Sequence, residues 1–145
     1  MILDEPVSGL DDIVRQDFLE SIVNVIQEEG QTVLMSSHLV HELERVADHV
    51  GILEGGKMIA QDTIDRVKGS VKQVTMGNEI ETANLPAQDF ALEKGQISTT
   101  VTIYDFDDDK LARLKAVGAD VLEVTDLPLE QAFVAHVRRP TGGAA

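Results

Sequence analysis

Two groups of polar side chains in this sequence have the chemistry of a catalytic site. The adjacent carboxylates Asp4 and Glu5 directly follow the apolar opening of the chain, and His38 closes the stretch "SSH" after a second apolar run. Carboxylates and histidine transfer protons in enzymes, and carboxylate oxygens bind Mg²⁺. An isolated Asp-Glu-Pro is also typical of an ordinary strand end with solvated acids. The choice between these interpretations depends on the elements that position the two groups.

Residues 1–61 have the pattern of strands alternating with helices. Helical spacing of apolar residues predicts a helix over 13–28, with an N-cap at Asp11 or Asp12 and a stop at Gly30. Its predicted apolar face is Val14, Phe18, Ile22 and Val25. The other predicted elements are a strand tail at 1–3, a strand at 32–35, a helix with Leu39, Leu43, Val46 and Ala47 on one face, and a hairpin of strands 50–53 and 58–61 around the turn 54–57.

This alternation favours a parallel sheet covered by helices. Ligands of such sheets bind outside the carboxyl ends of the strands. Asp4 with Glu5, and Ser37 with His38, follow two such ends. We therefore expect these side chains to meet, although more than thirty residues separate them along the chain.

The pattern changes near Gly69. Residues 71–96 are weakly patterned, whereas 97–104 alternate cleanly and predict a strand, followed by a strand at 119–124. The acids at 107–109 suit a helix N-terminus, Gly118 closes that helix, and Asp126 is a candidate cap for the last helix. The strand 97–104 has Ile97, Thr99, Val101 and Ile103 on one face, and the predicted core of this part is Leu111, Leu114, Val117, Leu122, Val124, Leu129, Phe133 and Val137.

The composition excludes several classes of protein. The 145 residues carry a formal net charge of −14, which disfavours nucleic-acid binding because such binding needs clustered Lys and Arg. There is no cysteine, so neither a disulfide framework nor a thiolate metal site is encoded. No apolar run reaches the roughly 18 residues of a transmembrane helix. The simplest interpretation is a cytoplasmic protein without a transmembrane segment of its own.

Three ordered motifs resemble those of ABC-transporter ATPases. "MILDEP" resembles the Walker B segment of that family, "SGLD" at 8–11 resembles its D-loop, and "SSH" at 36–38 resembles its H-loop. The stretch 45–63 resembles the strand-turn-strand passage that follows in the family. The resemblance covers about the first 65 residues. The remainder resembles less specifically the C-terminal accessory domain of ATPase subunits of some bacterial exporters, through "GADVLEVTDLPLEQAF" at 118–133.

The resemblance implies roles for individual residues and the presence of ATP and Mg²⁺ as cofactors. Asp4 would hold Mg²⁺ through water, and Glu5 would polarise the attacking water as general base. His38 would contact the γ-phosphate. Ser8, Gly9 and Asp11 would meet nucleotide held by a second ATPase subunit, because this family sandwiches ATP between two copies. A transmembrane permease would be the other partner, placing the protein at the inner face of the cell membrane.

The phosphate loop G-x-x-x-x-G-K-[ST] is absent from the 145 residues. We therefore expect an α/β fold that is the C-terminal part of a P-loop NTPase core and is inactive alone. Met1 would then be either an internal Met of a longer ATPase taken as a start, or the edge of a fragment. The predicted domains are the ATPase part at 1–68, a small α+β accessory domain at 69–138 and a disordered tail at 139–145.

The leading hypothesis is an ATP-hydrolysing subunit of an ABC transporter, and an exporter in particular. The alternative is a non-catalytic regulatory or interaction module derived from such an ATPase. A zinc site at His38 and His41 lacks an obvious further ligand, so His41 and His49 are interpreted as surface residues. The acids at 105–109 lack the Gly and the distal Glu of a calcium loop and are interpreted as a helix start.

Overall fold

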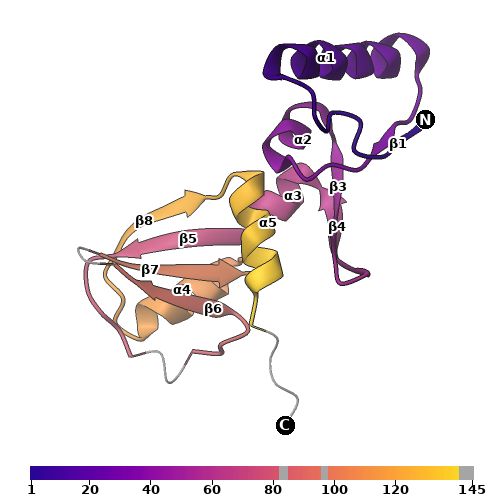
Figure 1. Ribbon diagram of the computed structural model, residues 1–145. Coiled ribbons are helices and arrows are strands. Elements are labelled where there is room, and N and C mark those ends of the chain that lie inside the picture. Colours follow the sequence, from indigo (N-terminus) through magenta and orange to yellow (C-terminus); the bar gives the residue numbers. More distant parts are fainter. Residues whose placement is uncertain (82–84, 96–97, 141–145) are drawn as a thin grey trace. The chain divides into compact units, whose positions relative to one another are not determined.

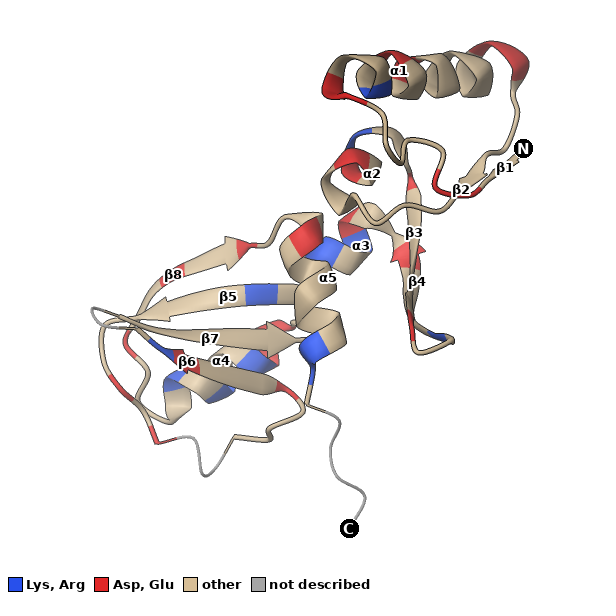
Figure 2. Ribbon diagram, viewed as in Figure 1, with Lys and Arg blue, Asp and Glu red and all other residues tan. Residues whose placement is uncertain are grey.

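The computed structural model of the chain describes residues 1–81, 85–95 and 98–140 (Figure 1). The chain divides into two compact units, Met1–Asp48 and His49–Ala145, here called the N-terminal and C-terminal units. The division between these units, at 48/49, lies earlier in the chain than the domain boundary at 68/69 that the sequence predicts. The domain boundary at 68/69 stays a prediction. Acidic residues occur on helices of both units and on strands of the C-terminal unit (Figure 2).

The N-terminal unit consists of β1 (Ile2–Leu3), α1 (Asp12–Glu29), β2 (Leu34–Met35) and α2 (Val40–Val46). The two strands pair in parallel, with Ile2 opposite Leu34 and Leu3 opposite Met35. The predicted parallel arrangement of these two strands is therefore confirmed, although both strands are short.

α1 begins and ends where its sequence predicts. The Asp11 carboxylate accepts hydrogen bonds from the backbone N–H groups of Ile13 and Val14, both at 3.1 Å, and so caps the helix. Gly30 adopts a φ of 63° and its N–H donates to the Ile26 carbonyl, which ends the helix in a left-handed turn. The predicted apolar face is only partly correct, because Ile22 is buried but Val14 is 46% exposed.

The C-terminal unit opens with the predicted hairpin. β3 (His49–Glu54) and β4 (Lys57–Thr63) pair antiparallel, and the turn between them places Gly55 and Gly56 at φ values of 54° and 77°. Such a pair of positive φ values is typical of a tight hairpin turn and favours glycine. A short helix that the sequence did not predict, α3 (Ile64–Gly69), follows at once, with its N-terminus capped by the Thr63 hydroxyl.

A four-stranded antiparallel sheet forms the body of this unit. Its strands are β5 (Val71–Met76), β6 (Phe90–Lys94), β7 (Thr99–Tyr104) and β8 (Val121–Asp126), in the order β6-β7-β5-β8. β7 and β8 confirm the predicted strands, and Ile97 lies outside the described residues. β5 and β6 are new. β5 escaped prediction because Val71 and Val74 are both fully buried on opposite faces, so its apolar residues do not alternate.

Helices cover both faces of the sheet (Figure 1). α4 (Asp108–Ala116) contributes Leu114 to one core cluster, and α5 (Leu129–Arg138) contributes Ala132 to the other. The first cluster consists of Val74, Met76, Phe90, Val101, Ile103 and Leu114, and the second of Val71, Tyr104, Leu127 and Ala132. Successive strand residues point to opposite faces, which separates the two clusters.

Three predictions about the end of this unit are wrong. Asp126 does not cap the last helix, because it belongs to β8 and its carboxylate pairs with the Lys72 ammonium at 2.8 Å. Leu122 and Val124 are not core residues: they are 63% and 38% exposed, since β8 is an edge strand with a neighbour on one side only. Arg139 is not part of a free tail, because its guanidinium pairs with Asp105 at 2.5 Å.

The remaining core assignments need smaller changes. Leu114 and Leu129 are fully buried as predicted, whereas Phe133 and Val137 are only half-buried on α5. Residues 141–145 of the predicted tail lie outside the described residues.

Candidate functional site

The parallel pairing of β1 with β2 brings two strand ends together. Leu3 lies opposite Met35, so the next residues, Asp4 and Ser36, are neighbours. The Ser36 hydroxyl donates to Asp4 Oδ1 at 2.5 Å and accepts a hydrogen bond from the Glu5 backbone N–H at 2.8 Å. One hydroxyl therefore fixes both the first carboxylate and the backbone of the residue that carries the second.

Glu5 and His38 form the second contact of the site. His38 Nδ1 lies 2.7 Å from Glu5 Oε2, and the two side chains are 63% and 39% exposed. Glu5 adopts a φ of 45°, in the left-handed region that is uncommon for residues other than glycine. This conformation turns the chain sharply after Asp4. Strained backbone of this kind is concentrated at functional sites.

The turn at residues 8–11 follows directly. Ser8 N–H donates to the Glu5 carbonyl at 3.1 Å, and Leu10 N–H donates to the Val7 carbonyl at 3.3 Å. Val7 is 1% exposed and anchors the turn, while Ser8 and Gly9 are exposed, with Gly9 at a φ of 78°. The tip of this turn is therefore exposed to solvent.

The structure brings together three of the predicted site residues, Asp4, Glu5 and His38. Ser8, Gly9 and Asp11 lie in the adjoining 8–11 turn, and none of the hydrogen bonds between described residues joins their side chains to the other three. The Asp11 side chain instead caps α1. Ser36 is the residue that sequence reasoning missed. The sequence contains a signal for Ser36, because Ser36 directly follows β2 just as Asp4 directly follows β1.

Asp4 suits a magnesium ion better than a transition metal. Its side chain is exposed, and within the described part of the chain only Ser36 donates a hydrogen bond to it. Mg²⁺ takes oxygen ligands and is usually held by one or two carboxylates together with water and substrate phosphates. Across residues 1–81, 85–95 and 98–140, no group of three or more His, Cys, Asp or Glu side chains is arranged to hold a metal ion.

The acids at 105–109 have structural partners. The Asp107 carboxylate accepts a hydrogen bond from the Lys110 backbone N–H and caps α4. The Arg139 guanidinium beside Asp105 holds the pKa of that carboxyl below its usual range. The Asp107 cap confirms the predicted helix start, whereas Asp105 lies before the helix and pairs with Arg139.

Two known proteins similar to most of this chain are both described as ABC transporter ATP-binding proteins. The chain is 33% identical over 135 residues to the uncharacterized ABC transporter ATP-binding protein YcbN of Bacillus subtilis, covering 88% of this chain and 43% of that protein. It is 26% identical over 141 residues to the ABC transporter ATP-binding protein YtrB of Bacillus subtilis, covering 93% of this chain and 47% of that protein. The chain is homologous to ABC transporter ATP-binding proteins. The parallel β1–β2 pair with its helices fits the C-terminal part of the P-loop NTPase fold of this family.

Other ABC transporter ATP-binding proteins match mainly a shorter stretch. The bacitracin transport ATP-binding protein BcrA of Bacillus licheniformis is 38% identical over 68 residues, 47% of this chain and 22% of that protein. No protein-family model matches the chain. The chain spans about half the length of the first two ABC transporter proteins, 47% and 43% of them. Among the helices that the structure describes, none has the length and apolar character needed to cross a membrane.

Proposed function

We propose that this chain supplies the water-activating and γ-phosphate-contacting residues of an ABC-type ATPase that drives transport across a membrane. The observation that carries the proposal is the contact between Glu5 and His38, beside Asp4, at the ends of two parallel strands. ATP hydrolysis is the activity expected of a chain homologous to ABC transporter ATP-binding proteins. The name of BcrA, a bacitracin transport ATP-binding protein, supports a role in transport. The direction that we propose, export, rests on the resemblance of residues 118–133 to exporter ATPase subunits.

Each residue has a distinct chemical task in this proposal. Glu5 accepts the proton of the attacking water, since its carboxylate is part-exposed and held by His38. With Nδ1 donating to Glu5, the other ring nitrogen of His38 remains available to the γ-phosphate. Asp4 would hold Mg²⁺ through water, and the ion would neutralise charge on the phosphate oxygens.

Binding of the triphosphate requires residues that these 145 do not contain. A phosphate loop supplies backbone N–H groups and a lysine to the β- and γ-phosphates, and no such motif occurs in the sequence. We therefore expect the 145 residues alone to be inactive. The partners we propose are a second ATPase subunit, met by the 8–11 turn, and a transmembrane permease at the inner face of the membrane.

The test is Glu5→Gln in the whole protein as its gene encodes it. Gln is nearly isosteric with Glu and cannot accept a proton, so ATP binding should persist while turnover falls by about 10²–10⁴-fold. Phosphate release and binding of a fluorescent ATP analogue measure the two properties separately. Glu28→Gln, at an exposed position of α1, is the matched control and should keep normal turnover. Turnover by Glu5→Gln close to that of the control would remove Glu5 as the base. Absence of phosphate release by the unsubstituted whole protein would favour the non-catalytic module.

A further inference from the structure

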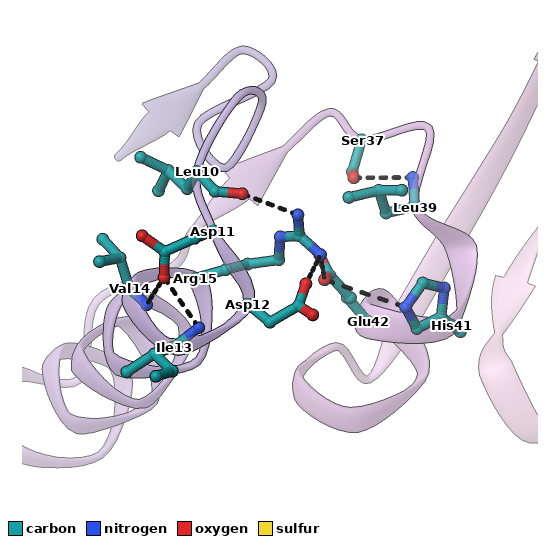
Figure 3. Close-up of polar contacts among 10 residues, drawn as sticks. All are labelled: Leu10, Asp11, Asp12, Ile13, Val14, Arg15, Ser37, Leu39, His41 and Glu42. Carbon is teal, nitrogen blue, oxygen red and sulfur yellow. Dashed lines mark hydrogen bonds and ion pairs between the residues drawn. The ribbon is translucent and has the colours of Figure 1, made fainter.

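A partly buried arginine contacts the 8–11 turn and the helix that follows His38 (Figure 3). Arg15 lies in the first turns of α1, just after the 8–11 turn. Its guanidinium donates from Nη2 to the Leu10 carbonyl and from Nη1 to Glu42 Oε1, each at 2.9 Å. Glu42 lies at the start of α2, one helical turn after His38. A single side chain therefore contacts the backbone of one turn and the helix that follows the other.

Burial distinguishes this pair from the surface ion pairs of the chain. The Glu42 side chain is 9% exposed and the Arg15 side chain 20% exposed, whereas Asp12, which also contacts Arg15 at 3.2 Å, is 96% exposed. Exposed pairs contribute little, but removing one partner of a buried pair leaves an uncompensated charge. Glu42 is thus the partner that depends on Arg15, and Asp12 is peripheral.

Two polar atoms of the Arg15–Glu42 pair lack hydrogen-bond partners among the described residues. Arg15 Nε and Glu42 Oε2 are both buried, and neither has a hydrogen-bond partner among the described residues. Among the described residues, the only other basic nitrogen that pairs with the Glu42 carboxylate is His41 Nε2, which lies 3.9 Å from Oε1, and the His41 side chain is 62% exposed. The loss of the Arg15 guanidinium would therefore leave Glu42 without a close donor of positive charge.

Hydrogen bonds of the backbone link the helix that contains Glu42 to the residues beside His38. The Ser37 hydroxyl accepts from the Leu39 backbone N–H at 3.0 Å, and Glu42 N–H donates to the Leu39 carbonyl at 3.1 Å. The 36–38 turn thus continues without a break into the helix that Arg15 holds. On the other side, the Leu10 carbonyl belongs to the 8–11 turn itself.

We propose that Arg15 is a positioning residue, which fixes the 8–11 turn and the His38 turn relative to each other through Leu10 and Glu42. The proposal rests on the proposed function, in which both turns contact nucleotide. Displacement of a catalytic group by about 1 Å can lower a rate by about 100-fold. Arg15 touches none of the predicted catalytic side chains, so its effect on turnover is exerted through the two turns.

The experiment compares Arg15→Met with Arg45→Met in the whole protein. Arg45 lines a groove between α1 and α2 together with Arg15 and Glu42, and it makes no ion pair with a described residue, so it is the matched control. Arg15→Met should lower kcat by about 10–100-fold with the KM for ATP changed by less than about threefold. Arg45→Met should leave both constants near normal. Glu42→Gln combined with Arg15→Met should lower kcat no further than Arg15→Met alone, because the two side chains act as a unit.

A second measurement does not need activity. Backbone amide hydrogen exchange should become faster in residues 8–11 and 36–39 of Arg15→Met, and in neither stretch of Arg45→Met. If Arg15→Met does not fold, Arg15→Lys is measured instead. Lysine keeps the charge beside Glu42 but loses the fork that also reaches Leu10, so only exchange in 8–11 should rise.

The two proposals fail in different ways. If Glu5→Gln does not reduce turnover, the proposed function is wrong, and the exchange data alone decide the role of Arg15. Unchanged exchange in both turns of a folded Arg15 variant would overturn the positioning role. So would a loss of kcat in Arg15→Met no larger than that in Arg45→Met.

Discussion

At the scale of single residues, the candidate site depends on one hydroxyl that has no reactive role of its own. Ser36 donates to Asp4 and accepts from the Glu5 backbone, and so holds the two carboxylate-bearing residues at a fixed distance from β2. Groups that orient a metal-holding carboxylate typically change metal affinity or activity when they are removed. The strained φ of Glu5 makes the same contact more important, since a left-handed residue keeps its conformation only when its surroundings hold it.

Ser36→Ala tests this dependence. We expect turnover of the whole protein, or its apparent affinity for Mg²⁺, to fall by about 10–100-fold. The melting temperature should change little because Ser36 is exposed. Phosphate release measured over a Mg²⁺ titration gives both quantities. Ser21→Ala removes a hydroxyl that bonds only to the Asp17 carbonyl within α1 and should be silent. Equal turnover in the two variants would contradict the role given to Ser36.

At the scale of elements, the sheet of the C-terminal unit separates leucines that look alike in sequence. Leu114 on α4 is fully buried against β5 and β7, whereas Leu122 on the edge strand β8 is 63% exposed. Both were predicted to be core residues. Only the substitution of Leu114 by a smaller residue removes apolar contacts and leaves a cavity.

Leu114→Ala should lower the free energy of unfolding by about 2–5 kcal/mol, the range for deleting a buried leucine side chain. Leu122→Ala should change it by less than about 0.5 kcal/mol, as is usual for surface substitutions. Urea denaturation followed by circular dichroism compares the two variants directly. A large effect at Leu122 would mean that β8 is covered in the folded protein.

The contact between α3 and α5 depends on a titratable group. His136 Nε2 lies 3.0 Å from the Ser70 hydroxyl, which itself donates to the Val67 carbonyl at 2.7 Å. Burial lowers the pKa of His136, and the positive charge of Arg139 acts in the same direction. The Val67 carbonyl and the Asp105 carboxylate oppose the shift. The neutral ring is therefore the form that the folded state prefers.

This preference predicts a loss of stability in mild acid. The unfolded chain protonates His136 near its ordinary pKa of 6.5, while the folded chain does so only at lower pH. The stabilisation is therefore present above about pH 6.5 and is lost as the pH falls through the folded pKa. His136→Gln should reduce the drop in unfolding free energy between about pH 7 and about pH 5. His49→Gln, at an exposed position, should keep it. Asp105, whose pKa is below 3.8, titrates outside this window.

At the scale of the whole molecule, the two units differ in how well the apolar side chains of their sheets are buried. Ile2 and Leu34 of the two-stranded parallel sheet are 80% and 65% exposed. Parallel sheets are normally covered on both faces, and a two-stranded ladder alone is marginal in water. The C-terminal unit instead buries two clusters on opposite faces of its own sheet.

We therefore expect three polypeptides to behave differently. Residues 49–140 should give dispersed amide NMR spectra and a cooperative melt, and residues 1–48 should give neither. Residues 71–138 should melt at a lower temperature than 49–140, because they lack Ser70, which bonds to His136 and accepts from the Phe106 backbone N–H at 2.9 Å. Equal melting of the last two would favour the predicted boundary near residue 69 over the structural division at 48/49.

Helices, strands and turns whose signals are local could be predicted from the amino-acid sequence. The caps at Asp11 and Gly30, the Gly55–Gly56 turn and the alternation in β7 act through neighbouring residues, so their elements could be predicted. The motifs around Asp4, Glu5 and His38 also named the candidate site. Features that depend on residues far apart in the chain became visible only in the three-dimensional fold. The register of β1 with β2 placed Ser36 against Asp4, and burial on both faces concealed β5. The ion pair of Arg15 with Glu42 has no local signal, because a buried charge is specified only by the residue that meets it across the fold.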